Sequence, residues 1–543
     1  MTCFHHLLAF TLLGFIGGTS FAQDGAPDKK APEKKPEEKK KDEGRLPHTK
    51  LMPAKLMPNL CVVKYRVSTA SPECQAFFDQ GLGYYYSYVW MEAARSFETA
   101  LKYDPNCALA AWGLSKASEK WGKAAYAPPL KKAQELMAYA NEREQRLIKA
   151  RLQEKGSIEG IKVEDRKKEA IKTLDELLAL FDDDEEGWFA RAQLADGPNA
   201  AVPFYKALLR YNPQHPGAHH ELLHHYENIR RPALGWPHAE GYVQSTPGIP
   251  HALHMQAHLA TRIGKWEKTT DRSARAVELE EAYHKMMKVA PSEDHQFSHH
   301  LETLMRSLIH DGRFKEADAL RKKCEGYKYK QNDHWFRLAL AERDWDGALK
   351  VANANTKDKT LTSYLRALVY LTKGDYERAR PEINVLQEAY QTNRTGKSGL
   401  ELELRLWLTQ GLLQCATDGG DGGVKLLAKA VEKTKADYGK HSWGQGAFYM
   451  EYWGLGALMA NRLPAAEEAF LEALAHDAGS VRGALGMQVV CERQGRTEEA
   501  HRFAELAQRC WRKADPGLIS AELEFLRGQG AAVSTSVETK RTN

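Results

Sequence analysis

The chain repeats a pattern of small, aromatic and proline residues every 34 positions, and this pattern restricts its fold more than any other feature. In the clearest copy, residues 74–107, Gly81, Tyr84, Phe97 and Pro105 stand at positions 8, 11, 24 and 32 of the unit. Small residues let two helices approach closely, aromatic rings fill the space between them, and the proline ends the second helix. Each unit therefore predicts one helix-turn-helix pair.

Further copies follow in step: three consecutive units begin 34 residues apart, and so do the last two. The predicted repeats are residues 74–107, 182–215, 216–249, 250–283, 298–331, 360–393, 447–480 and 481–514. A period of this length is typical of tetratricopeptide (TPR) repeats. We therefore predict an all-α fold, an α-solenoid of TPR-type repeats that forms a right-handed superhelix over residues 59–526. Residues 108–181 contain long charged helices without a clear register.

The composition agrees with a helical, water-soluble repeat array. Hydrophobic residues make up 43% of the 543 residues and charged residues 27%, and alternation typical of strands is scarce. The formal net charge is only +5, and the charges alternate in sign along the helices. Because we find no basic stripe, we predict that the protein has no nucleic-acid partner.

Both ends of the chain differ from the repeats. Residues 1–22 are typical of a signal peptide, since an apolar core at residues 7–16 precedes a small-x-small cleavage site at residues 20–22. We predict export to the periplasm or cell envelope; an uncleaved signal that anchors the chain in the membrane is the alternative. Residues 23–58, rich in lysine, glutamate and proline, predict a disordered linker, and residues 527–543 a disordered tail.

Seven cysteines follow the signal and are widely scattered. An oxidising compartment allows a disulfide, for which Cys61 with Cys74 or Cys107 is the favoured pairing. Thiols that simply pack in the helical core are the alternative, which we favour for the last four cysteines.

The repeat register predicts which side chains face the groove of the solenoid. Positions 4, 7, 8 and 11 of the first helix point into the core, so positions 2, 5, 9, 12 and 13 share the opposite, concave face. In three repeats these positions are rich in histidine and in charged residues: His220, His224, Glu227, His251, His254, His258, Arg262, His299, Glu302, Arg306 and His310. Tyr85 and Tyr86 of the first repeat are also predicted to face the groove.

Pairs of histidines four residues apart predict a metal site in this groove. Such a pair places two imidazoles on one helix face, and a second pair on the next repeat lies roughly 10 Å away by the usual helix spacing. The predicted ligands are His220, His224, Glu227, His251, His254, His258 and His299, and the predicted metal is zinc, copper or nickel. A groove for a non-metal ligand and histidines with a structural role are the alternatives.

The segment His220-Glu221-Leu222-Leu223-His224 matches the H-E-x-x-H motif of zinc peptidases. In those enzymes the histidines hold zinc and the glutamate acts as general base. Glu221 falls between groove and core, and the motif lies in repeat register, which argues against a separate catalytic domain. If the protein is an enzyme, Glu221 or Glu227 is the predicted base.

From about Leu60 to Ile519 the chain resembles a family of large exported bacterial tetratricopeptide proteins. The segments that carry the resemblance are FFDQGLGYYYSYVWMEAARSFETALKYDPNCALAAWG, HPGAHHELLHHYE, PHALHMQAHLATRIGKW, FSHHLETLMRSLIHDGRFKEA and RCWRKAD. The resemblance implies that the histidines of the groove match the family's histidine-bearing motifs. The chain departs from the family at Tyr86, where a histidine is common, and at Glu221, where an apolar or aromatic residue is common. The second departure lowers the weight of the peptidase motif.

Three functions follow from these observations. The preferred prediction is an exported scaffold that binds a peptide or protein partner in its groove, with the histidines as a recognition or metal-bridging site. The alternatives are a protein that binds or handles metal ions and a metal-dependent enzyme.

Overall fold

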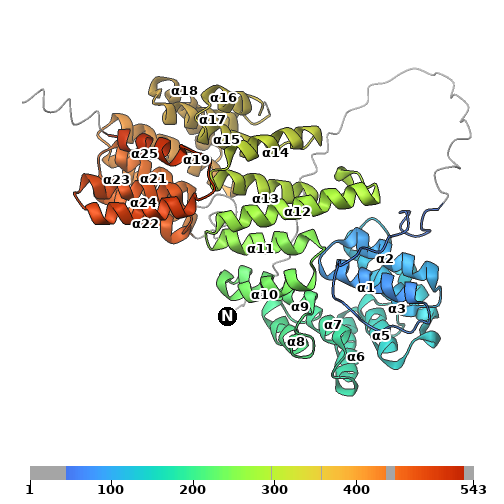
Figure 1. The fold of residues 1–543 in the computed structure, drawn as a ribbon. Coiled ribbons are helices and arrows are strands. Elements are labelled where there is room, and N and C mark those ends of the chain that lie inside the picture. Colours follow the sequence, from blue (N-terminus) through green and yellow to red (C-terminus); the bar gives the residue numbers. More distant parts are fainter. Residues whose placement is uncertain (1–43, 295, 356, 436–446, 531–543) are drawn as a thin grey trace, which may run out of the picture. The chain divides into compact units, whose positions relative to one another are not determined.

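A computed structural model describes residues 44–294, 296–355, 357–435 and 447–530 of the chain (Figure 1). Every element of regular secondary structure within these ranges is a helix, so the predicted all-α solenoid is confirmed. The α-helices are α1 Pro72–Tyr86, α2 Trp90–Tyr103, α3 Ala108–Trp121, α4 Ala127–Glu135, α5 Glu142–Lys155, α6 Arg166–Leu180, α7 Glu185–Gln193, α8 Pro198–Tyr211, α9 Pro216–Asn228, α10 Pro232–Ser245, α11 Pro250–Arg262, α12 Trp266–Met287, α13 Phe297–His310, α14 Phe314–Gly326, α15 Asn332–Ala341, α16 Trp345–Asn353, α17 Lys359–Lys373, α18 Tyr376–Thr392, α19 Gly396–Thr417, α20 Asp421–Lys435, α21 Phe448–Met459, α22 Leu463–His476, α23 Val481–Arg493, α24 Thr497–Cys510 and α25 Leu518–Gly528.

Consecutive helices pack against each other as hairpins, and the eight predicted repeats each span one such pair, from α1–α2 to α23–α24. The segment 108–181, which lacked a repeat register, contains the four helices α3 to α6. The predicted signal at residues 1–22 lies outside the described residues, as does the tail from residue 531 onward. No helix in the described part of the chain is both long and apolar enough to cross a membrane.

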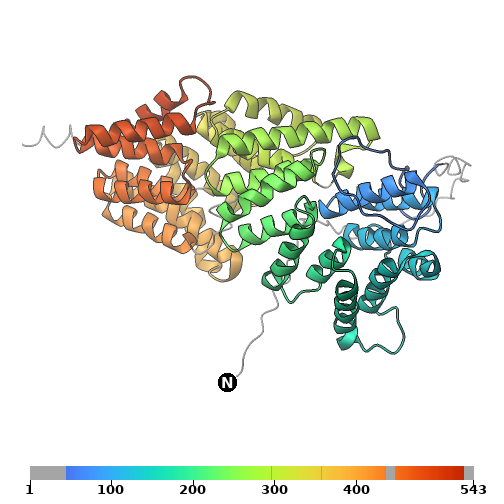
Figure 2. The same cartoon turned by 60° about the horizontal axis from the view of Figure 1, so that its bottom comes forward.

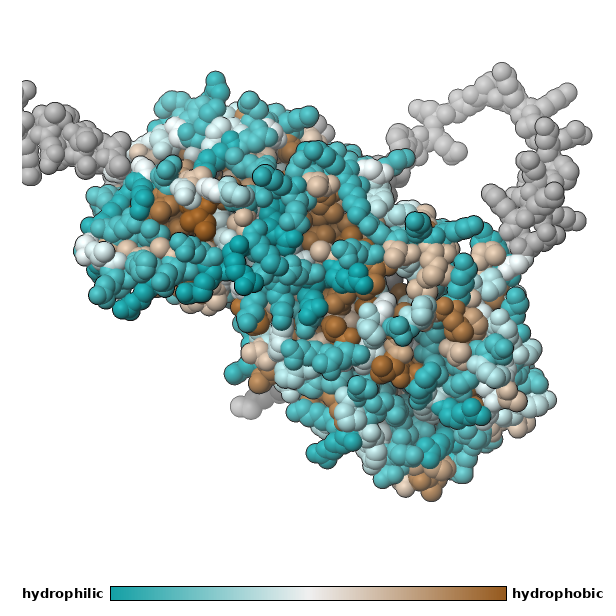
Figure 3. All heavy atoms as spheres, viewed as in Figure 1, coloured by the Kyte–Doolittle hydropathy of each residue, from teal (hydrophilic) through white to brown (hydrophobic). Residues whose placement is uncertain are grey.

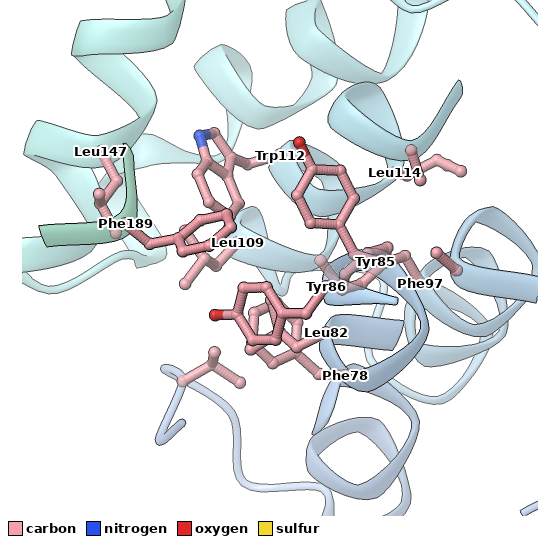
Figure 4. Close-up of a cluster of buried hydrophobic side chains, with 14 of the residues drawn as sticks. Phe78, Leu82, Tyr85, Tyr86, Phe97, Leu109, Trp112, Leu114, Leu147 and Phe189 are labelled. Carbon is pink, nitrogen blue, oxygen red and sulfur yellow. The ribbon is translucent and has the colours of Figure 1, made fainter. Parts of the chain in front are cut away.

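The repeat pattern has a direct structural cause at Phe97 of α2. A Cβ atom placed on Gly81 of α1 or on Gly113 of α3 would lie 2.7 Å from the ring of Phe97. Glycine at both positions lets three helices close around one aromatic ring. Figure 4 shows Phe97 within the N-terminal core, and its ring centre lies 5.4 Å from that of Phe78. The same arrangement recurs in α21 to α23, where Gly454 and Gly486 lie against the ring of Phe470.

The turn glycine of the repeat allows a close contact between distant parts of the chain. Gly264, between α11 and α12, has a φ of 69°, in the left-handed region that favours glycine. A Cβ atom here would lie 2.5 Å from the backbone nitrogen of Gly479. The neighbouring indole of Trp266 donates to Asp477 Oδ2 at 2.9 Å. The α11–α12 turn is therefore fixed against the loop between α22 and α23.

Residues 46–58, which precede the first repeat, pack against it, although the predicted linker includes them. Leu46 and Ala54 are buried, and the backbone nitrogen of Thr49 donates to Glu98 Oε2 at 2.8 Å. The backbone nitrogen of Ala54 donates to Thr99 Oγ1 at 2.9 Å. Residues 46–58, predicted as disordered linker, thus form a strap across α2, because buried side chains on that helix hold its backbone groups.

All seven described cysteines are free thiols. Cys74 and Cys107 are both buried, and the neighbouring thiol of Cys107 lowers the pKa of Cys74. The disulfides considered for Cys61 are therefore not formed in this structure.

Hydrophilic residues cover most of the face seen in Figure 3, with smaller hydrophobic patches between them.

Candidate metal centre

Helices α9, α11 and α13 are the first helices of three successive repeats, and they bring the predicted histidines together. Figures 1 and 2 show the helices of this middle part of the chain, in green, stacked side by side. Two groups of three histidines result, and within each group one nitrogen per histidine lies within 4.8 Å of the others. The groups are His220, His224 and His251, called group 1 below, and His254, His258 and His299, called group 2.

Group 1 is centred on His220. Its Nε2 lies 3.1 Å from Nε2 of His224, one turn further along α9, and 3.2 Å from Nε2 of His251 on α11. Proline at the first position of both helices sets their start. The four-residue spacing then places His220 and His224 on one helix face.

The hydrogen bonds of His220 determine which of its nitrogens is free for a ligand. Its Nδ1 lies 2.7 Å from the backbone carbonyl oxygen of Tyr86, which only accepts, so Nδ1 carries the proton. In the neutral ring Nε2 then carries a lone pair and no proton. His224 and His251 both approach that one lone pair, yet it can accept from only one of them. A metal ion between the three nitrogens removes this conflict, because it accepts all three lone pairs.

Group 2 is built in the same way from α11 and α13. Nε2 of His258 lies 2.8 Å from Nε2 of His254, again one turn apart on a helix. The ring of His299 on α13 lies 4.7 Å from that of His254, centre to centre. Nδ1 of the buried His254 has no hydrogen-bond partner among the described residues. Three imidazoles therefore meet here as well, from two neighbouring repeats.

Glu227 lies behind the ligand nitrogens rather than among them. Its carboxylate oxygens lie 3.5 Å from Nδ1 of His258 and 4.0 Å from Nδ1 of His224, and Arg262 donates to it at 3.0 Å. Burial would raise the pKa of Glu227, but His258, Arg262 and His224 together lower it to about 2. A carboxylate that holds Nδ1 of a histidine orients Nε2 toward a metal. Glu227, predicted as a ligand, thus holds Nδ1 of His258 in group 2 and lies near Nδ1 of His224 in group 1, beyond hydrogen-bond distance.

The two groups adjoin each other through α11. His251 of group 1 and His254 of group 2 are three residues apart, and their ring centres are 5.8 Å apart. His300, which we did not predict, lies with its ring centre 4.2 Å from that of His254, and its Nδ1 is 2.8 Å from Oε2 of Glu280 on α12. The repeat register placed His299 in the groove but not His300. That His300 directly follows His299 in the sequence was the available indication that it lies near the site.

The site runs from the interior to the surface. His220, His251 and His254 are 0%, 8% and 1% exposed, whereas His224 is partly exposed and His299 is exposed. Burial lowers the pKa of His220, His251 and His254 well below that of a free histidine, because a charged ring loses its hydration there. The imidazoles are therefore neutral at pH 7, the state that binds metal ions.

Tyr88 closes group 1 on one side, although the repeat register did not indicate it. It lies in the turn between α1 and α2 with a φ of 59°, a conformation uncommon for a side chain of this size. Its ring stacks on His224 at an interplanar angle of 10°, and its hydroxyl donates to Glu221 Oε1 at 2.8 Å. The strained turn thus places an aromatic ring against the histidines.

We expect Tyr88→Phe to destabilise the protein by about 1–3 kcal/mol, because it leaves the Glu221 carboxylate without this donor. Burial raises the pKa of Glu221, and the bond from Tyr88 opposes that rise. The loss should therefore be larger at pH 8 than at pH 5, because the bond from Tyr88 stabilises the ionised form of Glu221, whose share rises with pH. Thermal unfolding at the two pH values measures it, and Tyr139→Phe, at an exposed tyrosine, is the control. Equal losses at both pH values would contradict this account.

The other predicted groove residues are mostly paired or buried. Tyr85 and Tyr86 lie in the packed interior and not on an open groove: Tyr85 contacts Trp90, and Tyr86 contacts Phe189. Since α9 and neighbouring helices cover α1, its predicted groove face becomes an interface. The charged positions form ion pairs, Arg262 with Glu227 and Arg306 with Glu302 at 3.0 and 2.9 Å.

His215 supports the site by capping α9. Its Nδ1 accepts a hydrogen bond from the backbone nitrogen of Ala218 at 3.1 Å, which satisfies a free donor at the helix start. Burial lowers the pKa of His215 to about 3. A protonated ring could no longer accept this bond, so the helix that carries His220 and His224 depends on a neutral His215.

Stability of the metal-free protein should therefore fall as the pH drops from about 6.5 toward about 3. In this window the unfolded chain binds a proton at residue 215 that the folded chain does not, which costs about 1.4 kcal/mol per pH unit. His215→Asn keeps a capping side chain but does not titrate. We expect its melting temperature to depend less steeply on pH than that of the wild type; identical slopes would contradict the assignment.

The helix pairs and this site define the class of protein: an all-α solenoid of TPR-type repeats with a cluster of histidines across three of them. No protein-family model matches the chain, and no curated protein matches its sequence. Among solved structures, a human IFIT1 dimer with m7Gppp-AAAA is 15% identical with a TM-score of 0.27, covering 84% of this chain and 92% of that one. Yeast Tom70 is 15% identical with a TM-score of 0.28, covering 85% and 96%. At these values the likenesses concern the helical fold and say nothing of function.

Proposed function

We propose that the protein is an exported, metal-binding solenoid that holds transition-metal ions in groups 1 and 2. The observation that carries the proposal is the convergence of two Nε2 atoms, of His224 and His251, on the lone pair of Nε2 of His220, within 3.2 Å. The supporting residues fit this role, since the Tyr86 carbonyl and Glu227 hold Nδ1 atoms and leave Nε2 atoms for the metal. Solvent reaches the site at His224 and His299, which gives an ion a route to it.

A peptide or protein partner in the groove, predicted from the repeat class, remains part of this proposal. The burial of His220, His251 and His254 argues that these rings contact metal ions and not a peptide. A partner would then bind elsewhere on the concave face or at the exposed edge of the site.

Elemental analysis of the mature protein, purified without a histidine tag, tests the proposal. We expect two equivalents of a transition metal per chain, one for each group, and a rise in melting temperature when metal is added to metal-free protein. His501→Ala, at an exposed histidine on α24, should leave both results unchanged. Metal-free protein that shows no thermal shift with zinc, copper or nickel would overturn the proposal.

A zinc-dependent hydrolase is a second candidate, because His220, His224 and His251 form a three-histidine set that contains the H-E-x-x-H motif. The proposed base, Glu221, accepts a hydrogen bond from Tyr88. If this candidate is right, Glu221→Gln should abolish peptide hydrolysis while metal stays bound. Absence of hydrolysis by the zinc-loaded wild type across a peptide library would reject it.

A further inference from the structure

We propose that groups 1 and 2 hold two copper ions side by side in the cuprous, Cu(I), state, and that Glu227 couples the two ions. This inference rests on the proposed metal-binding function and specifies the metal, its charge and its number. It follows from four properties of the site: the number of nitrogens, their chemical type, the charge around them and the position of Glu227.

The number of nitrogens favours two ions over one. Each group supplies three histidine nitrogens within 4.8 Å of one another, a set that suits one ion with metal–nitrogen distances of about 2.0 Å. The six histidines are too many for a single ion of tetrahedral preference. Because His251 and His254 are neighbours with ring centres 5.8 Å apart, the two ions would occupy adjoining positions.

The chemical type of the ligands favours copper. Both groups consist of imidazoles alone, whereas magnesium, calcium and manganese prefer oxygen ligands. Imidazole suits copper, zinc and nickel. Zinc prefers four ligands, whereas each group of the described residues supplies three nitrogens.

The charge around the site favours monovalent ions. A histidine that binds a metal does so as the neutral ring, and two carboxylates near the groups are already paired, Glu227 with Arg262 and Glu302 with Arg306. Burial raises the pKa of two others, Glu221 and Glu280, and so disfavours their charged forms. The residues around the ions therefore supply little net negative charge. At a given separation two divalent ions repel each other four times as strongly as two monovalent ions, and partial burial increases the effect. Cu(I) is the monovalent ion of this group of metals.

Glu227 is placed to act on both ions through their ligands. It lies beside Nδ1 of His224 in group 1 and beside Nδ1 of His258 in group 2. A negative charge at that position makes each imidazole a better donor to its ion, and the contact at 3.5 Å also orients the ring of His258. Glu227 is therefore a positioning residue shared by the two groups, and its replacement should weaken both.

The test is an anaerobic titration of metal-free mature protein with Cu(I), in competition with the chromogenic Cu(I) chelator bicinchoninate. A parallel titration uses Zn²⁺ in competition with a zinc indicator. We expect two equivalents of Cu(I) to bind, both more tightly than Zn²⁺. X-ray absorption of the loaded protein should show copper bound by three nitrogens. Tighter binding of Zn²⁺, or a single equivalent of Cu(I), would overturn this inference and leave the proposed function standing; binding of no metal would overturn both.

Glu227→Gln tests the coupling, since the amide keeps the size of the side chain and removes its charge. We expect both Cu(I) dissociation constants to rise about 10–100-fold, with the helical circular dichroism unchanged. The control is Glu316→Gln, which removes the charge of an exposed ion pair with Arg313 and should change neither constant. A change in only one constant, or in neither, would contradict the coupling by Glu227.

Discussion

Replacing both His254 and His258 by alanine should lower the metal content of the protein from two equivalents to one. The change removes two of the three nitrogens of group 2 and leaves group 1 complete. Ligand binding stabilises a folded protein by about 4 kcal/mol when the free ligand is at a thousand times its dissociation constant. We therefore expect the variant to lose a stabilisation of this order on metal addition, measured by elemental analysis and by thermal unfolding with and without metal.

The matched control is His219→Ala with His238→Ala. These two histidines also contact each other, with their Nδ1 atoms 3.2 Å apart, but they belong to neither group. This variant should keep two equivalents of metal. If it loses as much metal as the His254 and His258 variant, the metal would lie outside groups 1 and 2.

Phe97→Ala should destabilise the N-terminal helices by about 3–5 kcal/mol, the usual cost of removing a buried phenylalanine ring. The ring fills the space between Gly81 and Gly113, and neither glycine has a side chain that could close the cavity. Because repeat arrays unfold in parts, we expect faster amide hydrogen exchange in α1 to α3.

Phe470 gives a crossed control in the same chain. Its ring lies between Gly454 and Gly486, where a Cβ atom would come within 2.4 Å of it. Phe470→Ala should speed exchange in α21 to α23 and leave α1 to α3 unchanged. If either substitution affected both regions equally, the two cores would not be independent, contrary to the separate hydrophobic clusters that contain the two rings.

Much of the fold was predictable because the repeat pattern records local contacts. Gly81 and Phe97 meet within one helix pair, so their spacing in the chain reports a contact that every TPR-type repeat makes. Residues 46–58 and Asp477 show the limit of such reasoning. The first segment directly follows a stretch rich in lysine, glutamate and proline and was grouped with it, and Asp477 meets Trp266 more than 200 residues away. Neither contact follows the 34-residue repeat, so the sequence pattern could not predict it.

Part of the candidate site was likewise predictable from the sequence, and part of it was not. The register placed His220, His224, His254 and His258 on the faces of two helices, since a four-residue spacing is one helical turn. It did not find Tyr88, which the structure holds against the site by a turn with positive φ. It also could not show that Glu227 lies behind the ligands, because a helical position gives the direction of a side chain but not its neighbours.

The sequence alone thus determined the class of fold and the helix faces that carry the histidines, because both depend on spacing along one helix or one hairpin. Only the tertiary structure decided that Nε2 atoms from α9 and α11 lie 3.2 Å apart, that Tyr85 and Tyr86 are covered, and that Glu227 lies between histidines of the two groups, 3.5 Å from His258 and 4.0 Å from His224. These properties depend on how closely successive repeats approach and on which rotamers fit between them, and packing across the whole array sets both.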